Sequence, residues 1–146
     1  MSQQNLNVLF IASEVEGLVK TGGLADVARA LPHALSSQGN HVTVVVPYYR
    51  QIAEKHDAPV VLESELVIDD MQTIGYAVRE LSLDGVRIWA LDCYVYYYRP
   101  ELYAENNEGY QDNAERFAFF SAASLDLVKK LNFRQMWCTV TTGIPV

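Results

Sequence analysis

The chain has 146 residues, of which 50% are hydrophobic, and a formal net charge of −7. This size and composition suit one globular domain with a substantial core, and the acidic balance argues against nucleic acid and anionic membranes as partners. Two cysteines and three scattered histidines offer neither a disulfide framework nor a metal-ligand spacing, so we expect a cytoplasmic protein without a metal or a cofactor.

The first elements along the chain predict a parallel sheet. Residues 7–13 and 41–47 are continuous apolar runs typical of strands buried on both faces, and the first is too short for a signal peptide or a membrane span. Between them a helix is indicated, which Gly39 is placed to end. Its apolar stripe consists of Leu24, Val27, Ala28, Leu31 and Leu35. A strand, a helix and a second strand in this order favour an α/β fold.

The middle of the chain contains three further strand-like segments, residues 60–69, 73–83 and 86–92. The last two are separated by the turn pair Asp84-Gly85, which favours a β-hairpin. We therefore expect hairpin strands added to the parallel core.

A tyrosine-rich loop, residues 94–110, precedes the last predicted helix. Asp112 and Glu115 have the spacing of a capping box, which predicts a helix that begins there and ends near Leu131. Asp112 is accordingly interpreted as a helix cap rather than as a catalytic carboxylate.

The stretch "GLVKTGGLADVARAL", residues 17–31, carries the strongest functional signal. It follows a parallel strand, so it lies where ligands of open α/β sheets bind, and the helix that begins there directs unpaired N–H groups at the same spot. Gly22 and Gly23 would let the backbone approach a ligand closely, and Lys20 adds a cation. Bare amides beside a lysine predict a phosphate site. The alternative is a tight strand-to-helix turn with a solvated lysine, since neither common phosphate-loop motif is present.

Four segments resemble a known family. They are "SEVEGLVKTGGLADVARALPHAL" (13–35), "VTVVVPYYRQI" (42–52), "YYRPELY" (97–103) and "YQDNAERFAFFSAASLDLVKKLNF" (110–133). Each is similar to the N-terminal part of bacterial glycogen synthases and plant starch synthases, glycosyltransferase family 5. The resemblance implies the Rossmann-like N-terminal domain of a GT-B glycosyltransferase. It also implies transfer of glucose from ADP-glucose to the non-reducing end of an α-1,4-glucan, with the anomeric configuration retained.

The resemblance also implies substrate-binding residues. Lys20 matches the family lysine that contacts ADP-glucose, and the Gly22 and Gly23 backbone matches the glycines that face its diphosphate. The resemblance makes Tyr103 the candidate for contact with the glucan acceptor, and tyrosine rings can stack on sugar faces. The alternative is that the rings of this loop pack beneath it, and we favour this alternative for Tyr94, Tyr96 and Tyr97.

Two carboxylates are implied as catalytic-site residues, Glu14 at the end of the first strand and Asp26 in the first turn of the helix. Each has a plainer alternative. Glu14 would be a solvated charge at a strand end, and Asp26 would be a first-turn carboxylate paired with Arg29.

The resemblance stops after Arg134, and we expect a domain boundary there, with residues 1–134 as a partial catalytic domain. The remaining segment, "QMWCTVTTGIPV" (135–146), is poorly patterned as a strand or a helix. Shifted by one base, its codons can encode "PDVVHCNDWHTG", which the family has at this place. We therefore predict a frameshifted, non-native tail. A divergent C-terminus is the alternative.

A chain that ends at this boundary would lack the C-terminal domain, which in this family forms the other wall of the active cleft. We therefore expect the chain alone to be inactive. A non-catalytic remnant with weak glucan or nucleotide binding is the alternative function. A different nucleotide-sugar enzyme, such as an epimerase, is a third possibility, although the dinucleotide motif G-x-G-x-x-G is absent from the sequence.

Overall fold

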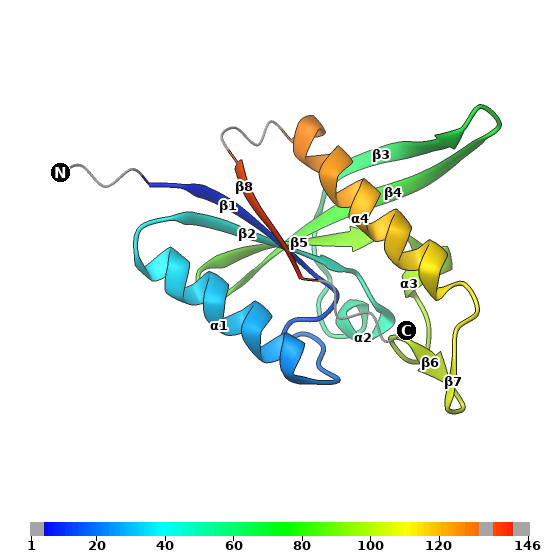
Figure 1. Ribbon diagram of the computed structural model, residues 1–146, viewed down its shortest axis with the longest axis horizontal. Helices are drawn as coiled ribbons and strands as arrows, with labels where there is room; N and C mark the ends of the chain where they lie inside the picture. Colours follow the sequence, from blue (N-terminus) through cyan, green and yellow to red (C-terminus); the bar gives the residue numbers. More distant parts are fainter. Residues whose placement is uncertain (1–4, 132–135, 142–146) are drawn as a thin grey trace.

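The computed structural model of the protein describes residues 5–131 and the backbone of residues 136–141. A six-stranded sheet forms its centre, with the strand order β3-β4-β5-β2-β1-β8 (Figure 1). Its strands are β1 (Asn7–Ala12), β2 (His41–Pro47), β3 (Val60–Asp69), β4 (Gln72–Leu83), β5 (Val86–Asp92) and β8 (Met136–Thr141). A small second sheet joins β6 (Ala104–Glu105) to β7 (Glu108–Gly109). The helices are α1 (Gly23–Ser37), α2 (Arg50–Ala53), α3 (Tyr94–Tyr97) and α4 (Asn113–Lys130).

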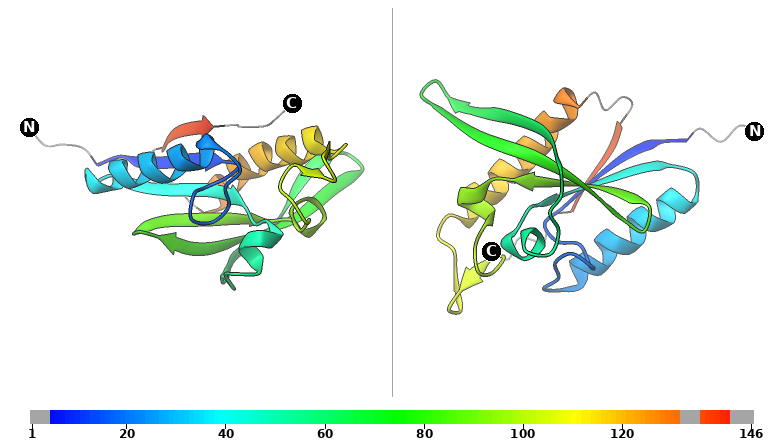
Figure 2. Two further views of the ribbon diagram at one scale, coloured as in Figure 1. Left: turned by 90° about the horizontal axis from the view of Figure 1, so that it is seen from below. Right: turned by 180° about the vertical axis from the view of Figure 1, so that it is seen from behind.

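The predicted division of the sheet is confirmed. β1 pairs in parallel with β2 and β8, and β2 pairs in parallel with β5. β3, β4 and β5 pair antiparallel, and the β3–β4 hairpin extends beyond the rest of the sheet beside α4 (Figure 2). Asp84 and Gly85 form the turn between β4 and β5 with positive φ angles of 49° and 79°, as the sequence pair predicts. The fold is therefore a mixed α/β fold with a parallel core.

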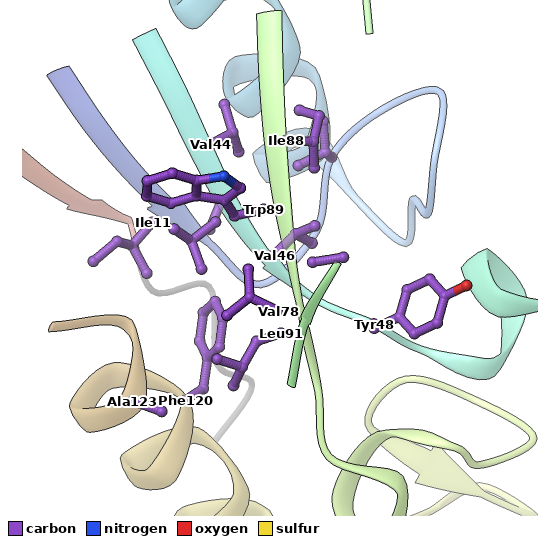
Figure 3. Packing of buried hydrophobic residues seen from close by; sticks show 14 of the residues in the cluster. Ile11, Val44, Val46, Tyr48, Val78, Ile88, Trp89, Leu91, Phe120 and Ala123 are labelled. Atoms are coloured by element: carbon purple, nitrogen blue, oxygen red, sulfur yellow. The ribbon is translucent and has the colours of Figure 1, made fainter. Parts of the chain in front are cut away.

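The two long helices pack on opposite faces of this sheet. Val78 and Leu91 are paired across β4 and β5, and Figure 3 shows them beside Phe120 of α4. Val44 and Ile88 are paired across β2 and β5 and lie on the α1 side (Figure 3). All five side chains are buried. Because successive residues of a strand alternate between faces, the parallel strands have an apolar residue at almost every position.

The predicted apolar stripe of α1 is only partly correct. Val27 and Leu31 are 49% and 42% exposed. The residues that α1 buries are Ala25, Ala28 and Pro32. Leu24 and Leu35 are half-buried, and Leu35 packs against the core, so the helix face that meets the sheet is displaced from the predicted stripe. The predicted helix end is confirmed, because Gly39 follows the C-cap with a φ of +92°.

The capping-box prediction for α4 is wrong in its chemistry. Asp112 is the N-cap residue, but its side chain makes no capping hydrogen bond. Both of its oxygens instead accept hydrogen bonds from Arg99, at 2.7 and 2.6 Å, and Arg99 lowers the pKa of the Asp112 carboxyl. Glu115 accepts a hydrogen bond from Tyr96 at 2.6 Å. Arg99 and Tyr96 thus bind the two carboxylates that the local sequence pattern assigned to capping the start of α4.

The segment after Arg134 contains a strand, which the sequence analysis did not expect. β8 pairs along the whole of β1, from Asn7 opposite Met136 to Ala12 opposite Thr141. Most residues of "MWCTVT" are β-branched or aromatic, which favours a strand despite the lack of alternation. The strand does not test the predicted domain boundary after Arg134, which stays a prediction.

In the described ranges, no helix has the length and hydropathy needed to cross a membrane.

Candidate functional site

Two loops that are distant in sequence meet just past the carboxyl end of β1. Glu14 lies in the loop that follows this strand, and Tyr103 lies in the loop between α3 and β6. The Tyr103 hydroxyl is 2.7 Å from Oε2 of Glu14 and 3.1 Å from Oγ of Ser13. This edge of a parallel sheet is where open α/β folds bind ligands, so the meeting point is the candidate site.

Glu14 anchors the first loop from beneath. Its side chain is buried, and its carboxylate accepts hydrogen bonds from the Thr21 amide at 3.2 Å, the Thr21 hydroxyl at 2.6 Å and the Gly22 amide at 3.0 Å. Burial acts to raise the pKa of Glu14, but the hydrogen bonds from Thr21, Tyr103 and Gly22 outweigh it, and the pKa lies below its ordinary value. Glu14 is therefore an ionised group inside the loop. The interpretation of Glu14 as a solvated charge is wrong.

The position of Glu14 also corrects the expectation of bare loop amides. The Thr21 and Gly22 amides are occupied by its carboxylate. The amides of Gly23 and Leu24, the first two residues of α1, find no protein acceptor among the residues described. These two donors, together with the positive end of α1, remain to face a ligand.

Lys20 lies beside the start of α1 and is paired with Asp26. Its ammonium nitrogen is 2.7 Å from Oδ1 and 2.8 Å from Oδ2 of Asp26, and the two side chains are 48% and 55% exposed. The hydrogen bond to Asp26 raises the pKa of Lys20. Arg29 contacts Glu16 and Asp84 instead, so the predicted pairing of Asp26 with Arg29 is wrong. The exposed ammonium can reach a ligand once it leaves Asp26.

The glycine pair is not required by the folded backbone. A Cβ atom added to Gly22 or Gly23 would meet nothing within 4 Å, and neither residue has a positive φ. Gly17 in the same loop differs, because its φ is +90° and an added Cβ would lie 2.2 Å from Arg29. The space over Gly22 and Gly23 is therefore open, which is the condition for a ligand to approach the backbone closely.

The tyrosine-rich loop divides into buried and exposed rings. Tyr96 and Tyr97 are buried, as the sequence analysis expects. Tyr94 is 69% exposed and stacks on Tyr98 with ring centroids 4.7 Å apart, so the expectation that it packs beneath the loop is wrong. Tyr103 is half-buried, with its ring centroid 5.6 Å from that of Phe117. Burial raises the pKa of Tyr103, which keeps its hydroxyl protonated.

Sequence reasoning missed four residues that shape the site. Ser13 and Thr21 lie within the recognised stretch but were not singled out. Asn113 and Arg116 lie on α4, and Arg116 is fully buried. A sequence signal for Arg116 existed: it shares helical spacing with the buried Phe120, so it is a charged residue on an apolar stripe.

The chemistry of the site follows from these groups. A lysine and two helix-start amides can bind an anion, and the Tyr103 hydroxyl and its ring can contact a sugar. Clusters of three or more His, Cys, Asp or Glu side chains suited to a metal ion do not occur in the part of the chain that the structure describes.

Comparisons with known proteins show which family the chain belongs to. A family profile described as "Starch synthase catalytic domain" matches residues 7–140, which includes the first part of the segment after Arg134. The chain is 52% identical over 134 residues to a glycogen synthase of Vibrio atlanticus, covering 92% of this chain and 27% of that protein. It is 50% identical over 135 residues to a glycogen synthase of Photobacterium profundum, with the same coverage.

A solved structure has the same fold. The catalytic domain of starch synthase IV from Arabidopsis thaliana, bound to ADP and acarbose, superposes with a TM-score of 0.77 at 24% identity, over 92% of this chain and 28% of that one. The chain thus spans a little over a quarter of the length of each of these three proteins.

Proposed function

The chain belongs to the family of starch synthase catalytic domains, and from this premise we propose that it is the N-terminal part of a glycogen synthase. The complete enzyme would transfer glucose from ADP-glucose to the non-reducing end of an α-1,4-glucan. The observation that carries the proposal is the contact between Tyr103 and Glu14, because it brings the glucan-facing loop to the loop with the lysine and the glycine pair.

On the donor side, Lys20 and the start of α1 bind the diphosphate. The ammonium of Lys20 exchanges Asp26 for a phosphate oxygen, and the Gly23 and Leu24 amides donate to the same anion. Gly22 contributes the open space beside them. Cationic groups and oriented amides placed where a diphosphate leaves provide the electrostatic stabilisation that dominates such group transfers.

On the acceptor side, Tyr103 contacts the glucan, and Asp26 lies close enough to Lys20 to take part in the same site. Glu14 is ionised and holds several hydrogen bonds, so its role in the catalytic site is to hold Tyr103, Thr21 and Gly22 in place rather than to supply a proton. We assign it a positioning role for that reason.

The 146 residues form one wall of the proposed cleft, and a C-terminal domain would provide the other. We therefore propose that a polypeptide of these residues alone transfers no glucose. The competing function is a non-catalytic remnant that binds glucan or nucleotide weakly. A cytoplasmic location also stays a prediction.

The test is a binding and transfer experiment on the 146-residue chain. Calorimetric titration with ADP-glucose and with maltohexaose should show weak binding of both, and radiolabelled ADP-glucose should yield no labelled glucan. Lys20→Ala should remove the ADP-glucose signal and leave the maltohexaose signal in place. Binding of NAD without binding of ADP-glucose would contradict the proposed donor, and robust glucan labelling would contradict the need for a second domain.

A further inference from the structure

Arg116 is a fully buried arginine of α4 that donates hydrogen bonds to α3, to the loop that carries Tyr103 and to Asn113 of its own helix. Its Nε donates to the Tyr96 carbonyl at 2.7 Å, and its Nη1 donates to the Leu102 carbonyl at 2.9 Å and to Oδ1 of Asn113 at 2.8 Å. None of these acceptors is a carboxylate, and Nη2 has no hydrogen-bond partner within the described residues. Burial lowers the pKa of Arg116. A buried cation without a charged partner is costly, so stability alone gives little reason for an arginine here.

Asn113, the first residue of α4, completes this arrangement. Its Nδ2 donates to the Tyr103 carbonyl at 2.9 Å while its Oδ1 accepts from Arg116. A guanidinium can only donate and a carbonyl can only accept, so the two contacts fix the orientation of the Asn113 amide. The carbonyls of two consecutive residues, Leu102 and Tyr103, are therefore both held by side chains from α4.

The tyrosine-rich segment, residues 94–110, is also attached through Arg99 and Tyr110. Arg99 forms the bidentate pair with Asp112, and both Arg99 and Arg116 lie over the ring of Tyr110, with guanidinium carbons 4.8 and 4.9 Å from its centroid. The Tyr110 amide also donates to the Tyr103 carbonyl at 3.0 Å. The Tyr103 carbonyl thus accepts hydrogen bonds from both Tyr110 and Asn113.

We propose that Arg116 and Asn113 are positioning residues of the candidate site, which fix the backbone at Tyr103 so that its hydroxyl meets Glu14. Glu14 in turn holds the Thr21 and Gly22 amides. The two α4 residues therefore set the geometry of the loop that carries Lys20, Gly22 and Gly23, although they do not touch that loop. Calling these contacts part of a ligand site rests on the proposed function, whereas the contacts themselves do not.

Asn113 is the residue to change, because it is half-buried and its loss leaves the core of α4 intact. Asn113→Ala removes both contacts, and Asn113→Asp keeps the acceptor for Arg116 but loses the donor to Tyr103. NMR on the 146-residue chain gives both readouts, which are the pH titration of the Glu14 side-chain carboxyl and the amide signals of Thr21 and Gly22.

Both variants should move the Glu14 pKa upward toward its ordinary value and shift the Thr21 and Gly22 amide signals. The matched control is Ser121→Ala, which removes a hydrogen bond to the Phe117 carbonyl within α4 and should leave both readouts unchanged. Variants that unfold more easily but keep the wild-type Glu14 titration and amide signals would overturn the inference. Failure of the wild-type chain to bind ADP would overturn the proposed function instead, and the Glu14 readout would still decide the positioning role.

Discussion

The hydroxyl of Tyr103 lies 2.7 Å from the carboxylate of Glu14, although the two residues are 89 positions apart in the chain. This contact joins the loop after β1 to the loop before β6, and it places a protonated phenol against an ionised, buried carboxylate. Hydrogen bonds to charged groups are among the stronger ones in proteins, so the contact ties the two loops into one site.

Removing the phenol should therefore weaken the fold and disturb Glu14. We expect Tyr103→Phe to lower the free energy of unfolding by about 1–3 kcal/mol, because a buried carboxylate loses a donor. The pKa of Glu14 should rise in the same variant. Urea unfolding measures the first effect and NMR titration the second. Tyr94→Phe, on an exposed ring, is the control, and an equal effect in both variants would refute the role of this contact.

The depressed pKa of Glu14 gives stability a defined pH dependence. Its contribution is fully present above the unfolded-state pKa of about 4.3 and is lost as the pH falls through the lower folded-state pKa. Glu14→Gln should remove this contribution to the loss of stability in acid. The free energy of unfolding of the variant should therefore fall less steeply below about pH 4.3 than that of the wild type. Urea unfolding across this range checks the prediction, and parallel curves for the two proteins would contradict it.

The open space at the glycine pair predicts a separation of folding from binding. Gly22→Ala and Gly23→Ala should leave the unfolding midpoint nearly unchanged, since the added methyl group meets no protein atom. Both should weaken ADP binding by about tenfold or more, equivalent to about 1.4 kcal/mol, because the methyl group occupies the proposed ligand space.

Gly17→Ala provides the contrast. A φ of +90° and the close approach to Arg29 should destabilise this variant by about 1–3 kcal/mol. Thermal unfolding and ADP titration of the three variants test both statements together. Loss of stability at Gly22 with unchanged ADP binding would reverse the assignment of that glycine.

The ion pair between Lys20 and Asp26 predicts competition with an anionic ligand. In Asp26→Asn the ammonium loses its charged partner, so ADP should bind severalfold more tightly, while stability should change little because exposed ion pairs contribute little to folding. Glu54→Gln, which removes another exposed pair, is the control. Calorimetry that shows weaker ADP binding by Asp26→Asn would contradict this competition.

Local signals in the sequence predicted much of the fold. The strand ends, the Asp84-Gly85 turn and the helix end at Gly39 follow from turn and cap preferences that depend on neighbouring residues alone. The face of α1 was predicted less well, because spacing identifies an apolar stripe but not which edge of it meets the sheet. The capping role of Asp112 failed because a distant arginine, Arg99, binds the same carboxylate.

The membership of the candidate site stays a prediction, and the contacts among its residues were not predicted from the sequence. The resemblance identified Glu14, Lys20 and Tyr103, yet nothing local indicates that Glu14 would occupy the Gly22 amide or that Lys20 would pair with Asp26. Those contacts depend on the closure of loops across the sheet edge. The lone charged residue on the stripe of α4 was the only sequence hint of the arginine that supports Tyr103.

The most direct test of the account follows the amide signals of Gly23 and Leu24 by NMR while ADP is added to the 146-residue chain. These donors at the start of α1 should shift saturably with ADP, should not respond to adenosine, and should lose the response in Lys20→Ala. Equal shifts with ADP and adenosine, or no shift at these two amides at saturating ADP, would contradict the claim that this loop binds a diphosphate.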